Sequence, residues 1–288
     1  MAIERHVRRV GGLRWHWREA GDTGEGTAPP LVLLHPSPRS GAMYEGWMAA
    51  LAPQGRVLAI DTPGYGGSDS LPSPPSTMAD YAAPLHALLQ AVAGPRCVVY
   101  GSATGAQLAI AYAKLHPQAV VHLVLDNAAH FDDTEREAIV ARYFPDLSPR
   151  DDGSHLLDAW RMVARMAEYF PWFMADEAHR ISPRRPTAAE VHAGVQELLA
   201  AGPNWARAYR CAFEHERAAN VMALKVPTTV CRWAASILLP QIDRLLAHAL
   251  PANVGVLNVP AAIPERFATM TAHLAALRAA PTTASTTA

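Results

Sequence analysis

Residues 100–105 read "YGSATG", and this stretch decides how the chain around it is interpreted. The apolar run "RCVVYG" (96–101) predicts a buried strand before it, and "ATGAQLAIAYAKLHP" (103–117) predicts a helix after it. Sharp strand-to-helix turns of the form G-x-S-x-G hold a catalytic serine at the middle position. Here that position is Ala103, whose methyl group cannot attack a substrate. The sequence therefore predicts the backbone of a nucleophile turn without the nucleophile.

Short apolar runs alternate with helical stretches on both sides of this turn. Strand–helix repetition indicates a doubly wound, mostly parallel sheet, and continuously apolar runs are typical of strands covered on both faces. Thr77 or Ser76 is the expected N-cap of the second helix. The predicted strands are 13–21, 30–35, 56–61, 96–101, 120–126, 226–233 and 254–259, and the predicted helices are 41–52, 77–94, 103–117, 241–250 and 264–278.

The alternation stops at about residue 133 and resumes after residue 222. The segment 133–222 offers helical patterns, many aromatic residues and no convincing strand. We therefore expect an α/β core made of residues 1–132 and 223–280, interrupted by an all-helical insertion over 133–222. The small polar residues of 281–288 predict a disordered tail.

Composition excludes several functional classes. The net charge of −1 favours neither nucleic acid nor an anionic membrane surface, and no apolar run reaches transmembrane length. Three scattered cysteines predict buried free thiols, and no metal-binding spacing is present, so no metal or cofactor is expected. The charged N-terminal residues lack the apolar core of a signal peptide, which favours a cytoplasmic location. The sequence leaves open whether the protein forms a homodimer.

Four motifs in register make the chain resemble the α/β-hydrolase family with a helical cap, across nearly its whole length. "LLHPSP" (33–38) resembles the oxyanion loop, and "DTPGYGGSD" (61–69) resembles the turn after the fourth strand. "GSATG" (101–105) stands at the nucleophile elbow, and a final strand and helix close the pattern. The resemblance implies an α/β-hydrolase fold whose oxyanion hole includes the backbone N–H of Thr104.

The resemblance also shows where the catalytic triad is missing. The family's acid follows the strand at 226–233, but "WAASILLP" (233–240) contains no carboxylate. The family's base histidine follows the last strand, but "NVPAAIPERF" (258–267) contains no histidine. A single engineered change would have left two of the three positions intact. The sequence therefore predicts a degenerate triad, as in a pseudo-hydrolase.

The remaining polar residues near the predicted sheet edge are candidates for chemistry. Ligands of such sheets bind beyond the carboxyl ends of the strands. A structural role remains open for each candidate, in bracing its loop or in packing the cap. The candidate catalytic residues are His35, Asp126 and His130, and the candidate substrate-binding residues are Ser37, Arg39, Ala103, Thr104, Trp160, Phe170 and Trp172.

Three functions fit these observations. The first is a cofactor-independent enzyme of lyase, isomerase or cyclase type acting on a small apolar molecule, in bacterial secondary metabolism as one hypothesis. The second is a non-catalytic ligand-binding protein. The third is a hydrolase of a reactive substrate that uses an atypical acid or base. In each, the ligand is expected between Ala103, the loops 35–39 and 126–131, and the cap near 160–173.

Overall fold

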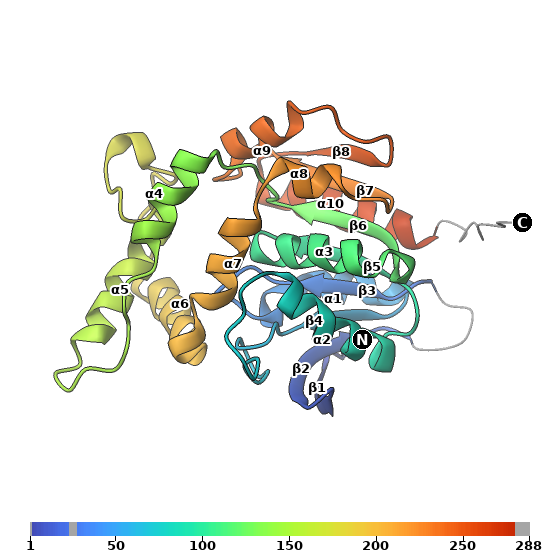
Figure 1. Ribbon diagram of the computed structural model, residues 1–288, viewed down its shortest axis with the longest axis horizontal. Helices are drawn as coiled ribbons and strands as arrows, with labels where there is room; N and C mark the ends of the chain where they lie inside the picture. The colour runs from blue at the N-terminus through green and yellow to red at the C-terminus, as the bar shows by residue number, and fades with distance from the viewer. Residues whose placement is uncertain (1, 23–27, 280–288) are drawn as a thin grey trace, which may run out of the picture.

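One eight-stranded sheet crosses the middle of the computed structural model, which describes residues 2–22 and 28–279 (Figure 1). The strand order is β1-β2-β4-β3-β5-β6-β7-β8. Strand β2 runs antiparallel to both of its neighbours, and all other neighbours are parallel. This confirms the predicted mostly parallel sheet. The strands are β1 Glu4–Val10, β2 Leu13–Ala20, β3 Leu31–Leu34, β4 Val57–Ile60, β5 Cys97–Ser102, β6 Val120–Asp126, β7 Thr228–Trp233 and β8 Val254–Val259.

The edge strand β1 is the one strand that the sequence analysis did not predict. Its residues "ERHVRRV" are mostly charged and exposed, so they show no apolar period. It forms a hairpin with β2 through Gly11 and Gly12, whose φ angles are 58° and 85°. A Gly-Gly pair adopts such positive φ angles without strain, and it was the available signal for this hairpin.

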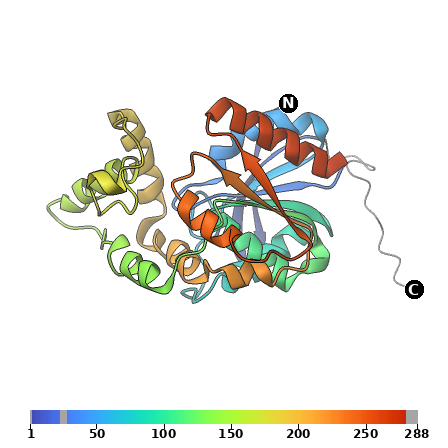
Figure 2. The same cartoon turned by 90° about the horizontal axis from the view of Figure 1, so that it is seen from above.

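Helices cover both faces of the sheet (Figure 2). Helices α1 and α10 pack on one face, and α2, α3 and α9 pack on the other. The central strands β3, β4 and β5 are consequently buried along their whole length. The core helices are α1 Glu45–Leu51, α2 Ala79–Val92, α3 Thr104–Leu115, α9 Leu239–Leu246 and α10 Ile263–Ala279.

The start of α2 differs from the predicted one. The sequence favoured Thr77 or Ser76 as the N-cap, but Met78 holds that position and makes no side-chain cap. The carboxylate of Asp80 instead accepts hydrogen bonds from the backbone N–H groups of Ser76 and Thr77, at 2.8 and 2.9 Å. An acidic side chain in the first turn also stabilises the positive end of the helix dipole.

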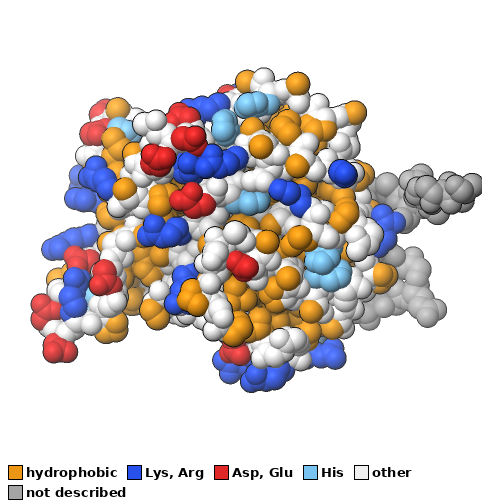
Figure 3. Space-filling model, viewed as in Figure 1, with side chains coloured by type: hydrophobic (Ala, Val, Ile, Leu, Met, Phe, Trp, Pro, Cys, Tyr) orange, Lys and Arg blue, Asp and Glu red, His pale blue; other side chains and the backbone are white. Residues whose placement is uncertain are grey.

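The insertion between β6 and β7 is helical, as the sequence predicted. Figure 1 shows α4, α5 and α6 to one side of the sheet, while α7 returns to the start of α3. Within 133–222 the only β-pairing is an isolated bridge between Tyr169 and Arg180. On the face drawn in Figure 3, side chains of both charge signs are interspersed over these helices. The helices are α4 Asp133–Tyr143, α5 Ser154–Met166, α6 Ala188–Ala200, α7 Arg207–His215 and α8 Ala218–Met222.

Three further sequence expectations concern the cysteines, the membrane and the tail. All three cysteines, Cys97, Cys211 and Cys231, are free and buried, as predicted. None of the helices within 2–22 and 28–279 is long and apolar enough to cross a membrane. The predicted disordered tail at 281–288 lies outside the described residues.

Candidate active site

The turn after β5 has the backbone of a nucleophile elbow. Ala103 stands at its tip with φ 49° and ψ −114°, a conformation that non-glycine residues rarely adopt. A Cβ atom on Gly101 would lie 2.2 Å from the Gly105 carbonyl oxygen, and one on Gly105 would lie 2.1 Å from that of Leu34. Only glycine therefore fits on either side of the turn, because strand and helix approach each other there.

Residues next to the tip retain polar groups. Thr104 begins α3, and its N–H has no hydrogen-bond acceptor in the described part of the chain. The Thr104 hydroxyl oxygen is also buried without a partner there. Ser102 is the last residue of β5 and is buried, so it does not occupy the tip. The elbow thus offers hydrogen-bond donors but holds no nucleophile at Ala103.

A cavity of about 220 Å³ lies beside Ala103. Its volume falls below the roughly 300–1,000 Å³ usual for drug-sized ligands. Residues from all four segments between which the sequence analysis expected a ligand line this cavity. Three of the predicted substrate-binding residues, Ala103, Thr104 and Phe170, are among them. The lining residues are Pro36, Ser102, Ala103, Thr104, Asn127, Phe170, Tyr209, Ala212, Phe213, Glu216, Ile237 and Leu238.

A second, larger cavity of about 610 Å³ adjoins the first. The two cavities share Phe170 and Ile237 as lining residues. The Ile237 side chain is 45% exposed, so this shared wall stands close to solvent. The two cavities are thus neighbours with a common wall.

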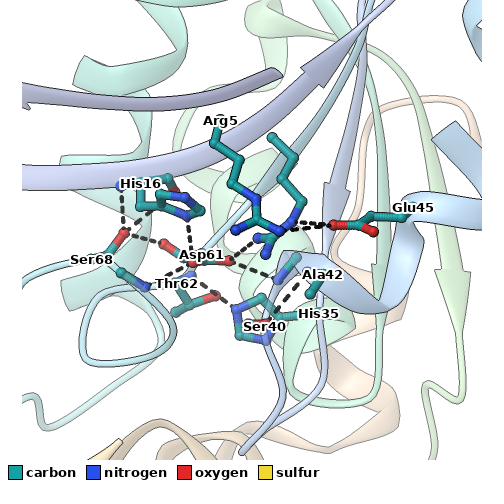
Figure 4. A network of polar contacts seen from close by, with 12 residues as sticks. Arg5, His16, His35, Ser40, Ala42, Glu45, Asp61, Thr62 and Ser68 are labelled. Carbon is teal, nitrogen blue, oxygen red and sulfur yellow. Dashed lines mark hydrogen bonds and ion pairs between the residues drawn. The ribbon is translucent and has the colours of Figure 1, made fainter. Parts of the chain in front are cut away.

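Asp61 braces the loop after β3 from the turn after β4 (Figure 4). Its buried carboxylate accepts hydrogen bonds from the N–H groups of Gly41 and Gly67, at 2.7 and 2.9 Å. The His16 ring donates to it at 2.7 Å, and the Arg18 guanidinium lies 3.7 Å away. Donors surround this carboxylate, which explains how the loop is held in place.

His35, predicted as catalytic, is also part of this framework (Figure 4). Its Nδ1 donates to the Pro36 carbonyl oxygen, and its Nε2 accepts from the Thr62 N–H, both at 3.0 Å. Burial lowers the pKa of His35, which keeps the ring neutral. With both nitrogens bonded to backbone and no share in the cavity lining, His35 lacks the free ring nitrogen that the predicted catalytic role requires.

The neighbouring predictions Ser37 and Arg39 lie away from the cavity. Ser37 is buried and contacts the Tyr65 hydroxyl. The Arg39 guanidinium forms an ion pair with Glu197 of α6 at 2.7 Å. Because neither residue lines the cavity beside Ala103, their predicted substrate contacts are not formed there.

Asp126 pairs with a cation rather than with a base. Its buried carboxylate accepts hydrogen bonds from the Tyr100 hydroxyl, at 2.6 Å, and from Arg266 of α10. Burial raises the pKa of Asp126, while Arg266 and Tyr100 oppose that rise. The Arg266 guanidinium also stacks on Trp233, 4.1 Å from the ring centroid. A guanidinium cannot give up its proton in a protein, so this pair cannot act as an acid–base dyad.

His130 and the two predicted tryptophans also stand outside the cavity lining. The His130 ring packs against the His248 ring and accepts a 3.4 Å hydrogen bond from the Ala218 N–H. Trp160 is 37% exposed on α5. The indole N–H of Trp172 donates to the Tyr143 carbonyl oxygen at 3.0 Å. His130 and Trp172 therefore make their polar and ring contacts with other parts of the protein, whereas Trp160 lies partly exposed on α5.

Glu216 is the cavity residue that the sequence analysis missed. It follows α7, is only 6% exposed, and lines the cavity beside Ala103. Its Oε1 accepts hydrogen bonds from Gln107 Nε2 of α3, at 3.2 Å, and from the Ala129 N–H, at 3.1 Å. Burial raises the pKa of Glu216 to about 8. No local pattern in "FEHERAAN" (213–220) distinguishes this carboxyl from its exposed neighbours.

Candidate metal sites are lacking in the parts of the chain that the structure describes. No group of three or more His, Cys, Asp or Glu side chains is arranged there to hold a metal ion. The polar groups that line the cavity are hydroxyl, amide and carboxyl groups of single residues. These groups can donate and accept hydrogen bonds, and the carboxyl can also transfer a proton.

A mostly parallel sheet with an elbow after β5 and a helical insertion after β6 defines the α/β-hydrolase fold. The family model described as alpha/beta hydrolase fold matches residues 29–153. The structure is similar to epoxide hydrolase A from Mycobacterium thermoresistibile, with a TM-score of 0.68 and 20% identity over 96% of this chain and 98% of that one. It is likewise similar to a laboratory-evolved potato epoxide hydrolase, with a TM-score of 0.70 and 21% identity over 95% and 98%. The chain therefore has the α/β-hydrolase fold, and the family model matches its first half over residues 29–153.

A curated relative gives a narrower match. Epoxide hydrolase 3 of Xenopus tropicalis is 32% identical over 124 residues, which cover 41% of this chain and 32% of that protein. The chain spans about a third of the length of the curated relatives it matches. The solved structures share the fold at identities too low to carry their activities over to this chain.

Proposed function

We propose that this chain is a cofactor-independent enzyme that acts on a small, mostly apolar molecule without forming a covalent intermediate. Its reaction class is isomerase or lyase. The observation that carries the proposal is Ala103, a methyl group at the tip of an otherwise intact nucleophile elbow. An enzyme without a nucleophile there has to work through proton transfer and electrostatic stabilisation.

The residues around Ala103 support a mechanism without a covalent intermediate. Phe170, Phe213 and Leu238 give the cavity an apolar wall, which excludes water from a bound molecule. The Thr104 N–H remains free to stabilise a developing negative charge on oxygen. Arg266 stands on the helix that follows the last strand, where the resemblance placed the base histidine, and it pairs with Asp126. A serine-type acylation cycle has neither nucleophile nor base in this arrangement.

Covalent probes test the proposal directly. A fluorophosphonate, p-nitrophenyl acetate and styrene oxide are each incubated with the protein, and intact mass is measured. We expect no adduct and no burst of p-nitrophenol, because no activated nucleophile lines the cavity. We also expect Ala103→Ser alone to restore no esterase turnover. Stoichiometric labelling of Ser102 or any other residue would overturn the non-covalent mechanism.

Filling the cavity tests where the molecule binds. Ala103→Trp places an indole in the space of about 220 Å³ beside the elbow. We expect loss of cyclohexanone binding, measured by saturation-transfer NMR, with a nearly unchanged thermal midpoint, because an empty space is filled. The matched control is Ala193→Trp on the exposed side of α6. Binding that survives in Ala103→Trp with intact folding would place the site elsewhere.

Hydrolysis of an epoxide is a second candidate, favoured by a specific pair of side chains. Tyr209 lines the cavity, and its hydroxyl lies 3.1 Å from that of the buried Tyr143. When Tyr143 donates in this contact, the Tyr209 proton is free for an epoxide oxygen. The similar proteins reported above are named epoxide hydrolases. Conversion of styrene oxide to an ¹⁸O-labelled diol in H₂¹⁸O, without an enzyme adduct, would favour this candidate over isomerisation.

A further inference from the structure

Glu216 lies where the helical insertion rejoins the core. It directly follows α7, and its partners Gln107 and Ala129 belong to α3 and to the loop after β6. Both partners are fixed by the elbow region, since α3 starts at Thr104 and the loop follows Asp126. The carboxyl is therefore held at the edge of the cavity from two sides.

The two oxygens of Glu216 have different surroundings. Oε1 accepts both hydrogen bonds, from Gln107 and from Ala129. Both hydrogen bonds that the carboxyl accepts from the described residues are on Oε1 and none is on Oε2, while Glu216 lines the cavity. An oxygen that already accepts two N–H groups is a poor site for a proton, so the proton of the neutral acid resides on Oε2. Proton uptake and release are thereby directed to the side of the cavity.

A short chain of contacts fixes this arrangement. His215 is largely buried, and burial lowers its pKa to about 4, so its ring is neutral. The ring Nδ1 lies 3.0 Å from Gln107 Oε1, which can only accept, so Nδ1 donates there. The amide nitrogen of Gln107 must then face Glu216. His215 and Gln107 are positioning residues for the carboxyl.

Glu216 also lacks the cation that normally accompanies a buried carboxylate. No lysine, arginine or histidine in the described chain forms an ion pair with it, in contrast to Asp126 and Arg266. The uncompensated burial is what raises the pKa of Glu216 to about 8. A group whose pKa lies near the working pH is suited to accept and return a proton in one reaction.

A second observation points to an oxygen-bearing ligand. The Thr104 hydroxyl oxygen is buried in the lining of the same cavity without a hydrogen-bond partner in the described chain. Buried polar atoms are normally satisfied, so this one calls for a partner that the protein does not supply. A carbonyl oxygen of a ligand would accept hydrogen bonds from both the Thr104 hydroxyl and its N–H.

Building on the function proposed above, we propose that Glu216 is the catalytic acid–base group and that the substrate is a small neutral ketone or related carbonyl compound. In a substrate that carries a C=C double bond β,γ to the carbonyl, the ionised Oε2 takes a proton from the α-carbon, and the electrons of that C–H bond form a dienolate. Thr104 stabilises the dienolate oxygen. Glu216 returns the same proton to the γ-carbon, so that the double bond moves into conjugation with the re-formed carbonyl. The reaction is an isomerisation that needs neither water nor a cofactor.

Hydrogen–deuterium exchange at carbon tests this step. Cyclohexanone is incubated with the protein in D₂O, and loss of its α-hydrogens is followed by NMR, with cyclohex-3-enone as the isomerisation probe. We expect exchange that increases with pH through about 8, where Glu216 ionises. Glu216→Gln keeps an Oε1 acceptor for both N–H donors, yet it should lower the exchange rate about a hundredfold or more. The control Glu214→Gln, at an exposed position near the end of α7, should leave the rate unchanged.

An infrared titration gives a readout that does not depend on turnover. The carbonyl stretch of a protonated carboxyl should be absent in Glu216→Gln and should disappear in the wild type near pH 8. Exchange that persists in Glu216→Gln, or cyclohexanone binding without exchange, overturns the role of Glu216 but leaves the non-covalent binding site standing. A covalent adduct at another residue, with Glu216-dependent exchange intact, refutes the proposed function instead.

Discussion

Two buried carboxyls of this chain differ in what surrounds them. Asp61, in the turn after β4, receives two backbone N–H groups and the His16 ring, and Arg18 lies nearby. Glu216, at the junction of α7 and the core, receives two N–H groups on one oxygen and has no cation. Asp61 is almost fully enclosed by protein, whereas Glu216 opens on a cavity.

The comparison shows how a buried carboxyl with a structural role differs from one that can take part in a reaction. A carboxylate whose oxygens all have donors has no capacity left for a substrate proton, and it holds its loop together. A carboxyl with one free oxygen and no cation costs stability when it ionises, and fixed groups elsewhere in the fold have to hold it in place. The predictions below change the structural carboxyl Asp61, the cavity carboxyl Glu216 and the elbow residue Ala103 in turn.

The largest effect on stability is expected at the structural carboxyl. Asp61→Ala leaves two N–H groups and His16 without an acceptor, and Arg18 without a nearby counter-charge. We expect the free energy of unfolding to fall by about 4 kcal/mol in chemical denaturation, as when one partner of a buried ion pair is removed. The control Asp158→Ala breaks an exposed pair with Arg150 and should not shift the denaturation midpoint measurably. If Asp61→Ala lowered the free energy of unfolding as little as Asp158→Ala, the structural role assigned to Asp61 would be wrong.

The pH dependence of stability tests the cavity carboxyl. The pKa of Glu216 is about 8 in the folded chain and 4.5 as the reference for the unfolded chain. Between these values the unfolded chain has lost the proton and the folded chain has kept it, so stability falls as pH rises through this window. We expect a loss of about 5 kcal/mol across it. Glu216→Gln should abolish this part of the pH dependence of the free energy of unfolding. An unchanged pH dependence in the variant would show that the pKa of Glu216 is not raised.

The smallest effect is expected at the tip of the elbow. Ala103 has a positive φ of 49°, which glycine adopts with less strain. We expect Ala103→Gly to raise the free energy of unfolding by about 1 kcal/mol, the release of strain exceeding the added chain entropy. The control Ala193→Gly, on the exposed face of α6, should lower it by about 1 kcal/mol. Equal losses in both variants would mean that the elbow is not strained.

Two of the candidate catalytic residues, His35 and Asp126, have their polar groups bound to other parts of the protein. His35 directly follows β3 and Asp126 is the last residue of β6, so both lie at the carboxyl edge of the sheet, where the sequence placed them. Position at that edge does not decide whether a polar group is free. His35 is saturated by backbone, and Asp126 is neutralised by Arg266, which is 140 residues away in sequence. The distant partners, Thr62 for His35 and Arg266 for Asp126, cannot be identified from the residues around the motifs.

The sequence by itself determined the sheet, the helical insertion and the elbow at Ala103. These depend on local patterns: apolar runs that alternate with helices, and Gly101 and Gly105, which close backbone contacts require. Only the tertiary structure decided which polar groups meet beside the elbow. Glu216 finds its donors on Gln107 and Ala129, 109 and 87 residues earlier in the chain. Its environment is set by the angle at which the insertion returns to α3, and no local pattern in the sequence encodes that angle.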